Sequence, residues 1–170
     1  MSNVISPLKS SARFSLRLRA GTAEELGKVV GFQLDLPINR CKADGDCLCA
    51  RLGPDEWFLM GPATENARLA RELEAALAER VFSLVDIGHR NVGIEVAGAH
   101  AREILNGGCP LDLNDGAFAP GTATRTLLGK AEIVLLRPGV ERLYRVECWR
   151  SFAPYVLAFL EDFIHPTPTQ

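Results

Sequence analysis

The sequence lacks the short glycine- and histidine-containing motifs that hold common cofactors. It has no Gly-x-Gly-x-x-Gly after a predicted strand, no phosphate-binding P-loop, no Gly-x-Ser-x-Gly and no His-Glu-x-x-His. Its 170 residues include three histidines, which leave little material for a metal site. We therefore predict no catalytic, cofactor-binding or metal-binding residues in this chain, and any redox cofactor should lie on another chain.

Long apolar runs and a strong net charge are also missing. No stretch approaches the roughly 18 apolar residues of a membrane span, and residues 1–15 have neither the apolar core nor the cleavage site of a signal peptide. The formal net charge is −2 and the isoelectric point is about 5.9, which argues against general binding to nucleic acid or anionic membranes. We expect a cytoplasmic protein whose partners are proteins or small molecules.

The cysteines do not form a recognisable framework. Cys47 and Cys49 are two apart on a predicted strand, so their side chains share a face, but no Cys-x-x-Cys pair or nearby histidine accompanies them. An odd number with irregular spacing favours free thiols in a cytosolic chain. We predict no disulfides and interpret these residues as small buried hydrophobes. The five are Cys41, Cys47, Cys49, Cys109 and Cys148.

The first half of the chain is predicted to contain strands and two helices. A capping box formed by Thr22 and Glu25 predicts a helix that ends before Pro37. The other elements expected here are a strand over 13–19, a polar loop over 38–46, a hairpin over 47–61, a helix capped by Thr64 and a strand over 81–87.

The second half repeats this order, which suggests a tandem duplication. It should contain strands over 91–96, 124–128, 132–137 and 143–150, a short helix over 99–106 and a last helix capped by Ser151. Hairpin-like connections favour antiparallel pairing. The predicted class is α+β, with two strand–helix–strand–strand–helix halves, mostly antiparallel sheets and helices packed on one side. The expected boundaries are a mobile arm over 1–12, halves over 13–81 and 82–164, and a tail over 165–170.

Polar and aromatic side chains near strand ends in the second half are candidates for an interface or a ligand site. His89, Arg90 and Asn91 lie at a junction between two strands, where they could bind an anion, contact a partner or make structural hydrogen bonds. Arginine and aromatic residues are enriched at interfaces, although ordinary packing explains them equally well. The candidate residues are His89, Arg90, Asn91, Arg125, Trp149, Arg150 and Phe152.

Five segments stand in order along the chain: LGPDEWFLMGP (52–62), VDIGHRNVGIEVAG (85–98), ILNGGCPLDL (104–113), TRTLLGKAEIVL (124–135) and ECWRSFAPYVLAFL (147–160). Together they resemble the gamma subunit family of heterotetrameric sarcosine oxidase. The resemblance implies a small subunit without its own catalytic centre, assembled with alpha, beta and delta chains. The complex it implies oxidises sarcosine to glycine and passes the one-carbon unit to tetrahydrofolate. Its implied cofactors are FAD, FMN, NAD and tetrahydrofolate, with the cofactors carried mainly by the alpha and beta chains.

The same segments are more distantly similar to the folate-binding aminomethyltransferase fold. Gly88 stands where that family has serine, and Ala131-Glu132 stands where it has an Asp-Asp pair. The loss of an acidic residue weakens the case for aminomethyl transfer and leaves the fold unaffected. The alternative hypothesis is a stand-alone folate-binding protein or one-carbon transferase. In it, His89, Arg90 and Arg125 would hold the glutamate tail or the pterin.

Overall fold

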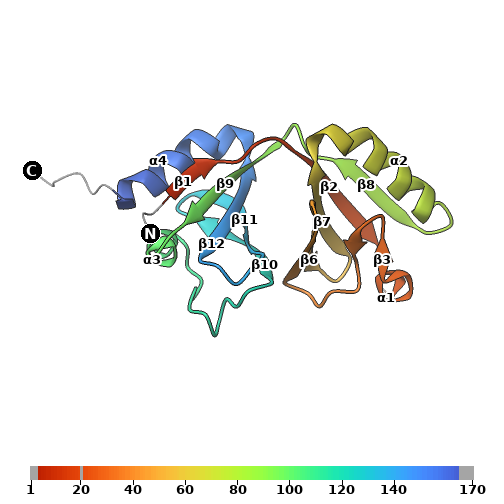
Figure 1. The fold of residues 1–170 in the computed structure, drawn as a ribbon, viewed down its shortest axis with the longest axis horizontal. Helices are drawn as coiled ribbons and strands as arrows, with labels where there is room; N and C mark the ends of the chain where they lie inside the picture. Colours follow the sequence, from red (N-terminus) through yellow and green to blue (C-terminus); the bar gives the residue numbers. More distant parts are fainter. Residues whose placement is uncertain (1–3, 20, 165–170) are drawn as a thin grey trace, which may run out of the picture. The chain divides into compact units, whose positions relative to one another are not determined.

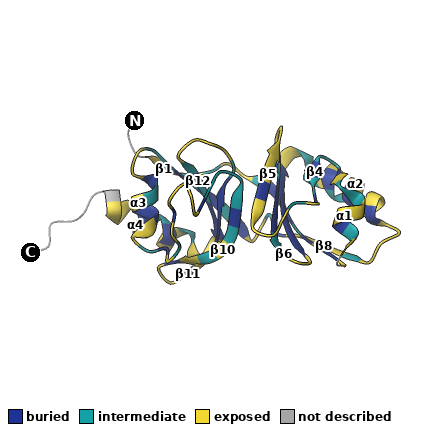
Figure 2. Ribbon diagram, turned by 90° about the horizontal axis from the view of Figure 1, so that it is seen from below, coloured by how far each residue is buried: buried dark blue, intermediate teal, exposed yellow. Residues whose placement is uncertain are grey.

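The computed structural model describes residues 4–19 and 21–164, which divide into two compact units (Figure 1). The first unit is Ser10–His89, and the second contains residues 4–9 and 90–164. Each unit has a run of five antiparallel strands and its own buried apolar cluster (Figure 2). The predicted α+β class with antiparallel pairing is confirmed.

In the first unit, neighbouring strands of the sheet follow the spatial order β5-β6-β7-β2-β8. The pairing of β6 with β7 confirms the predicted hairpin. The elements are β2 (Ser11–Leu18), α1 (Thr22–Leu26), β3 (Lys28–Val29), β4 (Phe32–Gln33), β5 (Arg40–Asp44), β6 (Cys47–Gly53), β7 (Glu56–Pro62), the 3-10 turn η1 (Ala63–Glu65), α2 (Asn66–Leu77) and β8 (Phe82–Asp86).

The second unit orders its strands β10-β11-β12-β9-β1, which is the same arrangement. Strands β9, β10, β11 and β12 correspond to β2, β5, β6 and β7 of the first unit. The remaining strand of each unit also has an equivalent place, because β8 lies beside β2 and β1 lies beside β9. The elements are β1 (Val4–Pro7), β9 (Asn91–Ala97), α3 (Ala101–Asn106), β10 (Thr122–Leu128), β11 (Ala131–Arg137), β12 (Leu143–Trp149), the 3-10 turn η2 (Arg150–Phe152) and α4 (Ala153–Ile164).

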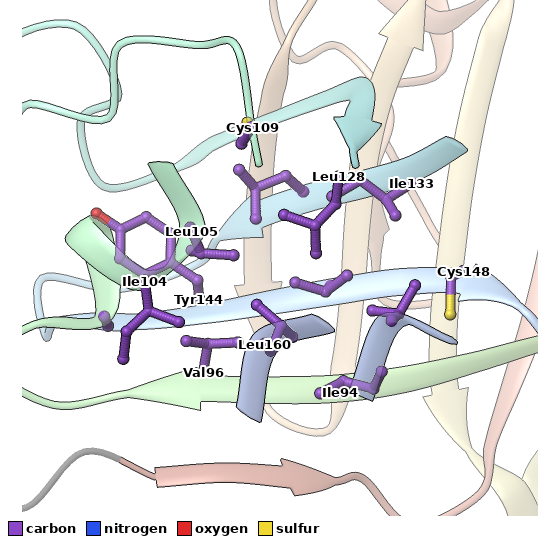
Figure 3. Packing of buried hydrophobic residues seen from close by; sticks show 14 of the residues in the cluster. Ile94, Val96, Ile104, Leu105, Cys109, Leu128, Ile133, Tyr144, Cys148 and Leu160 are labelled. Carbon is purple, nitrogen blue, oxygen red and sulfur yellow. The ribbon is translucent and has the colours of Figure 1, made fainter. Parts of the chain in front are cut away.

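One face of the second sheet builds the core of its unit. Because side chains alternate along a strand, Tyr144, Val146 and Cys148 of β12 share a face, and all three are buried. Figure 3 shows Leu105 of α3 beside Tyr144 and Leu160 of α4 beside Val96, within the same cluster. Both helices therefore pack on the same sheet face. No helix among the described residues is long and apolar enough to cross a membrane.

The helix predicted from Thr22 to Pro37 is wrong beyond its first turns. It ends at Leu26, and the following Gly27 has a φ of 63°, a conformation that favours glycine. The N-cap is Gly21, which makes no side-chain cap hydrogen bond, so the capping box does not form. The apolar residues that suggested a longer helix are buried along the β3–β4 hairpin instead, among them Val29 and Phe32.

The loop predicted over 38–46 is also wrong, because residues 40–44 form β5 and pair with β6. One side chain of this strand, Cys41, is buried and the others are exposed, so its polar composition concealed the pattern.

The mobile arm predicted over 1–12 also differs from the structure, because residues 4–7 form β1, with Val4 opposite Ala97, and β2 begins at Ser11. A strand of four residues is too short to show a period in the sequence.

The predicted boundary between the halves differs from the division in the structure. Strand β8 pairs with β2, with Ser15 opposite Val85, and so belongs to the first unit. The second unit takes its corresponding edge strand, β1, from the start of the described chain instead. The tail predicted over 165–170 lies outside the described residues.

Candidate functional site

Strands β9 and β12 bring several candidate residues together at one end of the second sheet. Asn91 is the register partner of Trp149, and the backbone N–H of Arg150 donates to the carbonyl oxygen of Arg90 over 2.7 Å. Phe152 follows in η2. Five of the seven candidates therefore meet here: Arg90, Asn91, Trp149, Arg150 and Phe152.

Strand alternation explains why Trp149 is exposed. Its neighbour Cys148 faces the core, so Trp149 points to the opposite face and remains 49% exposed. Asn91 shares that face but is buried. The sequence pattern thus leaves a large aromatic ring in contact with water. Removing its apolar surface from water would be favourable, so such a ring marks a surface that a partner can cover.

The exposed ring is held in place by its neighbours. The Arg90 guanidinium carbon lies 5.8 Å from the Trp149 ring centroid, and Arg90 Nε donates to Asn91 Oδ1 over 3.1 Å. The Phe152 ring meets Trp149 edge to face, with 6.5 Å between centroids. A cation over an aromatic ring contributes about 0.5–1 kcal/mol at an exposed site. We call Arg90, Asn91, Trp149 and Phe152 the Trp149 cluster.

A recess of about 320 Å³ opens beside this cluster. Its large apolar walls are half-exposed: 50% for Leu127, 49% for Trp149 and 39% for Phe152. Lys130 and Glu132 supply the charged part of the rim, and both are exposed. We call these five residues the Trp149 recess. Arg125 lies close by, with its Nε 3.9 Å from Glu132 Oε1.

Sequence reasoning missed Leu127, Lys130 and Glu132. The signal that was missing is the face of the sheet on which each residue lies. Leu127 and Arg125 are two apart on β10 and so share a face, and Leu127 is the register partner of Glu132 on β11. Arg125, Leu127 and Glu132 point away from the core face that carries Ile133. Had this register been known, Leu127 and Glu132 would have joined Arg125 as candidates, together with Lys130 in the turn between the two strands.

The turn that carries Lys130 is fixed against α4. The backbone N–H of Lys130 donates to Tyr155 Oη over 3.0 Å, and that of Gly129 donates to the Gly108 carbonyl oxygen over 3.0 Å. Gly129 has a φ of 57°, which favours glycine. The rings of Phe159 and Tyr155 lie where Cβ atoms at Gly108 and Gly129 would be. The rim of the Trp149 recess is therefore built on close packing.

His89 is placed with residues of the first unit. It lines a recess of about 250 Å³ together with Ser10, Ser11, Ala12, Ala63, Asn66, Asp86 and Gly88. There Asp86 accepts hydrogen bonds from Asn66 Nδ2 over 2.7 Å and from the backbone N–H of Gly88 over 2.8 Å. This carboxylate therefore holds the turn that follows β8.

The pKa values of several paired carboxyl groups and buried thiols are shifted from their usual ranges. A hydrogen bond from Arg137 holds the pKa of Asp115 below its usual range, and one from Arg51 lowers the pKa of Glu24. Burial raises the pKa of the Cys49 thiol. Within the described part of the chain, no group of three or more His, Cys, Asp or Glu residues could hold a metal ion.

Comparison with known proteins identifies a family. The model of the sarcosine oxidase, gamma subunit family matches residues 20–165. The sarcosine oxidase subunit gamma of Corynebacterium sp. (strain P-1) is 36% identical over 111 residues, which are 65% of this chain and 53% of that protein. The matched region thus spans about half the length of this relative.

Solved structures share the fold. A chain of the heterotetrameric sarcosine oxidase from Corynebacterium sp. U-96, in complex with pyrrole 2-carboxylate, matches with a TM-score of 0.87 and 23% identity, covering 99% of this chain and 86% of that one. The glycine cleavage system aminomethyltransferase T from Bartonella henselae matches with a TM-score of 0.72 and 13% identity, covering 93% of this chain and 45% of that one. The predicted likeness to the aminomethyltransferase fold is confirmed at the level of fold.

Proposed function

Because the chain belongs to the sarcosine oxidase gamma subunit family, we propose that it is a non-catalytic subunit of a cytoplasmic heterotetrameric sarcosine oxidase. The observation that carries this proposal is the family match over residues 20–165. Its partners are the alpha, beta and delta chains of such a complex. The complex oxidises sarcosine to glycine and passes the one-carbon unit to tetrahydrofolate.

The arrangement of the candidate residues supports a structural role. Arg90 is occupied by Asn91 and the Trp149 ring, and the Glu132 carboxylate lies beside the Arg125 guanidinium. A general base needs a free acceptor within hydrogen-bond reach of a substrate proton. Groups that stack on or pair with one another at an exposed sheet end are suited to contacts with a partner. The proposal therefore assigns FAD, FMN, NAD and tetrahydrofolate to the partner chains.

Co-expression with the alpha, beta and delta chains of the same genome tests this function. With an affinity tag on this chain alone, the other three chains should co-purify with it and elute as one species in size-exclusion chromatography. If all four chains are soluble and this one elutes alone, the proposal is wrong.

Calorimetry separates this proposal from the folate-binding alternative. The isolated chain is titrated with tetrahydrofolate, and the proposal expects no stoichiometric binding. Tight binding of one equivalent would favour the stand-alone folate protein in which Arg90 and Arg125 hold a carboxylate.

A further inference from the structure

We propose that the Trp149 recess receives an apolar side chain of a partner protein, and that a carboxylate beside this side chain pairs with Lys130 at the rim. When the partner is a subunit of the complex, this inference rests on the proposed function.

The apolar walls call for an apolar occupant. Leu127, Trp149 and Phe152 come from β10, β12 and η2, and each leaves between about a third and half of its surface in water. Exposed apolar patches around a concave centre mark interaction sites. Tryptophan is also enriched among the residues whose truncation costs interfaces the most affinity.

The recess is formed before any partner arrives. Arg90 and Asn91 fix one side of the Trp149 ring, and Tyr155 holds the backbone of Lys130 on the other side of the recess. A preformed surface loses little conformational entropy on binding. The rings therefore need no rearrangement to accept a side chain.

The charge of the rim selects an acidic neighbour. Lys130 places a cation beside the apolar walls, and the carboxylate of the rim, Glu132, is already near Arg125. Complementary charge steers association and suppresses wrong partners. An aspartate or glutamate next to the inserted side chain satisfies Lys130.

The lining favours a protein side chain over a small molecule. Small-molecule sites bury most of their ligand and direct buried polar groups at it. Here the polar lining residues, Lys130 and Glu132, are both exposed at the rim. A volume of about 320 Å³ bounded by half-exposed rings suits one or two side chains of a docked surface.

The isolated chain offers a test that does not depend on the complex. Blocked peptides Asp-Phe-Asp and Lys-Phe-Lys are titrated in, and the Trp149 indole resonance is followed by NMR. The other tryptophan, Trp57, is buried and serves as an internal reference. We expect a saturable shift of Trp149 with Asp-Phe-Asp and about tenfold weaker binding of Lys-Phe-Lys. Equal binding of the two peptides, or no shift with either, overturns the inference.

The assembled complex supplies the second test. Truncation by Trp149→Ala should weaken binding to the other chains by about 30-fold or more, and Lys130→Glu by about tenfold at low salt and less at high salt. The matched controls are Val140→Ala, at an exposed apolar residue of the same unit, and Arg71→Glu, on the exposed side of α2. Both controls should bind within about twofold of the wild type.

The outcomes separate the two proposals. If the wild type assembles and both Trp149→Ala and Lys130→Glu assemble equally well, the recess is not the docking site. Lys130 is exposed, so Lys130→Glu is expected to fold, and weaker assembly of this variant reports on the recess and not on the core. If the wild type does not assemble but the Asp-Phe-Asp shift is present, the proposed function fails and the inference stands. Loss of self-association in Trp149→Ala would identify a second copy as the occupant and overturn the inference.

Discussion

Arg51 of the first unit and Arg137 of the second hold corresponding positions, on β6 and β11. The Arg51 guanidinium carbon lies 4.8 Å from the Trp57 ring centroid on β7, and that of Arg137 lies 5.6 Å from the Tyr144 ring centroid on β12. Each side chain is nearly buried and donates to a carboxylate and to a backbone carbonyl oxygen of the segment before the hairpin. The same arrangement of a buried arginine over an aromatic ring in both units supports the tandem duplication suggested by the sequence.

Replacing Arg137 with alanine should lower the free energy of unfolding by about 2–3 kcal/mol. Its Nη1 donates to Asp115 Oδ1 over 2.7 Å and to the Phe118 carbonyl oxygen over 2.9 Å, so the loss frees the segment between α3 and β10. Arg51→Ala should cost a similar amount in the first unit, where Leu36 is released. Urea denaturation measures both variants. A loss below about 0.5 kcal/mol for either would contradict the equivalence.

The pair of Asp115 and Arg137 should make stability depend on pH in acid. Because Arg137 lowers the pKa of Asp115 in the folded state, the paired carboxylate stabilises the fold above the unfolded pKa of about 4. This contribution is lost as the pH falls through the lowered pKa. The stability difference between the wild type and Asp115→Asn should therefore shrink below about pH 4. Carbon NMR of the Asp115 carboxyl should show its pKa returning to normal in Arg137→Ala, and an unchanged pKa would refute the assignment.

Alanine at Gly108 should destabilise the protein by about 1–3 kcal/mol, because its Cβ would collide with the Phe159 ring. Gly116→Ala is the matched control, since no heavy atom lies within 4 Å of a Cβ built there. The cost of Gly108→Ala should fall in a Phe159→Leu background, where the ring is gone. Thermal unfolding of the wild type, the two single variants and the double variant gives the coupling energy between Gly108→Ala and Phe159→Leu. Equal costs in both backgrounds would show that the ring is not the cause.

The thiols should all be free and slow to react. The five cysteines form no disulfide in the structure, and all but the half-buried Cys47 are buried. Burial also raises the pKa of Cys47, which lowers its thiolate fraction at neutral pH. A disulfide-exchange reagent should find five thiols in denaturant and, in the native protein, at most a slow reaction of Cys47. A count below five in denaturant would reveal an unexpected bridge.

Periodicity predicted those elements whose two faces differ clearly. Strand β12 alternates between core residues such as Val146 and the exposed Trp149, and α2 buries Leu69, Leu73 and Leu77 along one stripe. It failed where local signals conflicted with tertiary pairing. The apolar spacing near Val29 suits a helix, but Gly27 and Gly31 take positive φ values and turn the chain into a hairpin.

The candidate site could be predicted in part, for a related reason. Composition pointed to Trp149, Phe152 and Arg90, because aromatic and arginine residues favour interfaces. The contribution of Leu127 and Lys130 depends on the register between β10 and β11 and on the contact of Tyr155 with the turn. Both are tertiary relationships that no local pattern in the sequence contains.

The most direct measurement of the central claim is native mass spectrometry of the four chains co-expressed and purified through a tag on the alpha chain. The account predicts a single assembly that contains this chain with the alpha, beta and delta chains, and that loses this chain when Trp149 is replaced by alanine. An alpha–beta–delta assembly that forms without the wild-type chain would contradict the account.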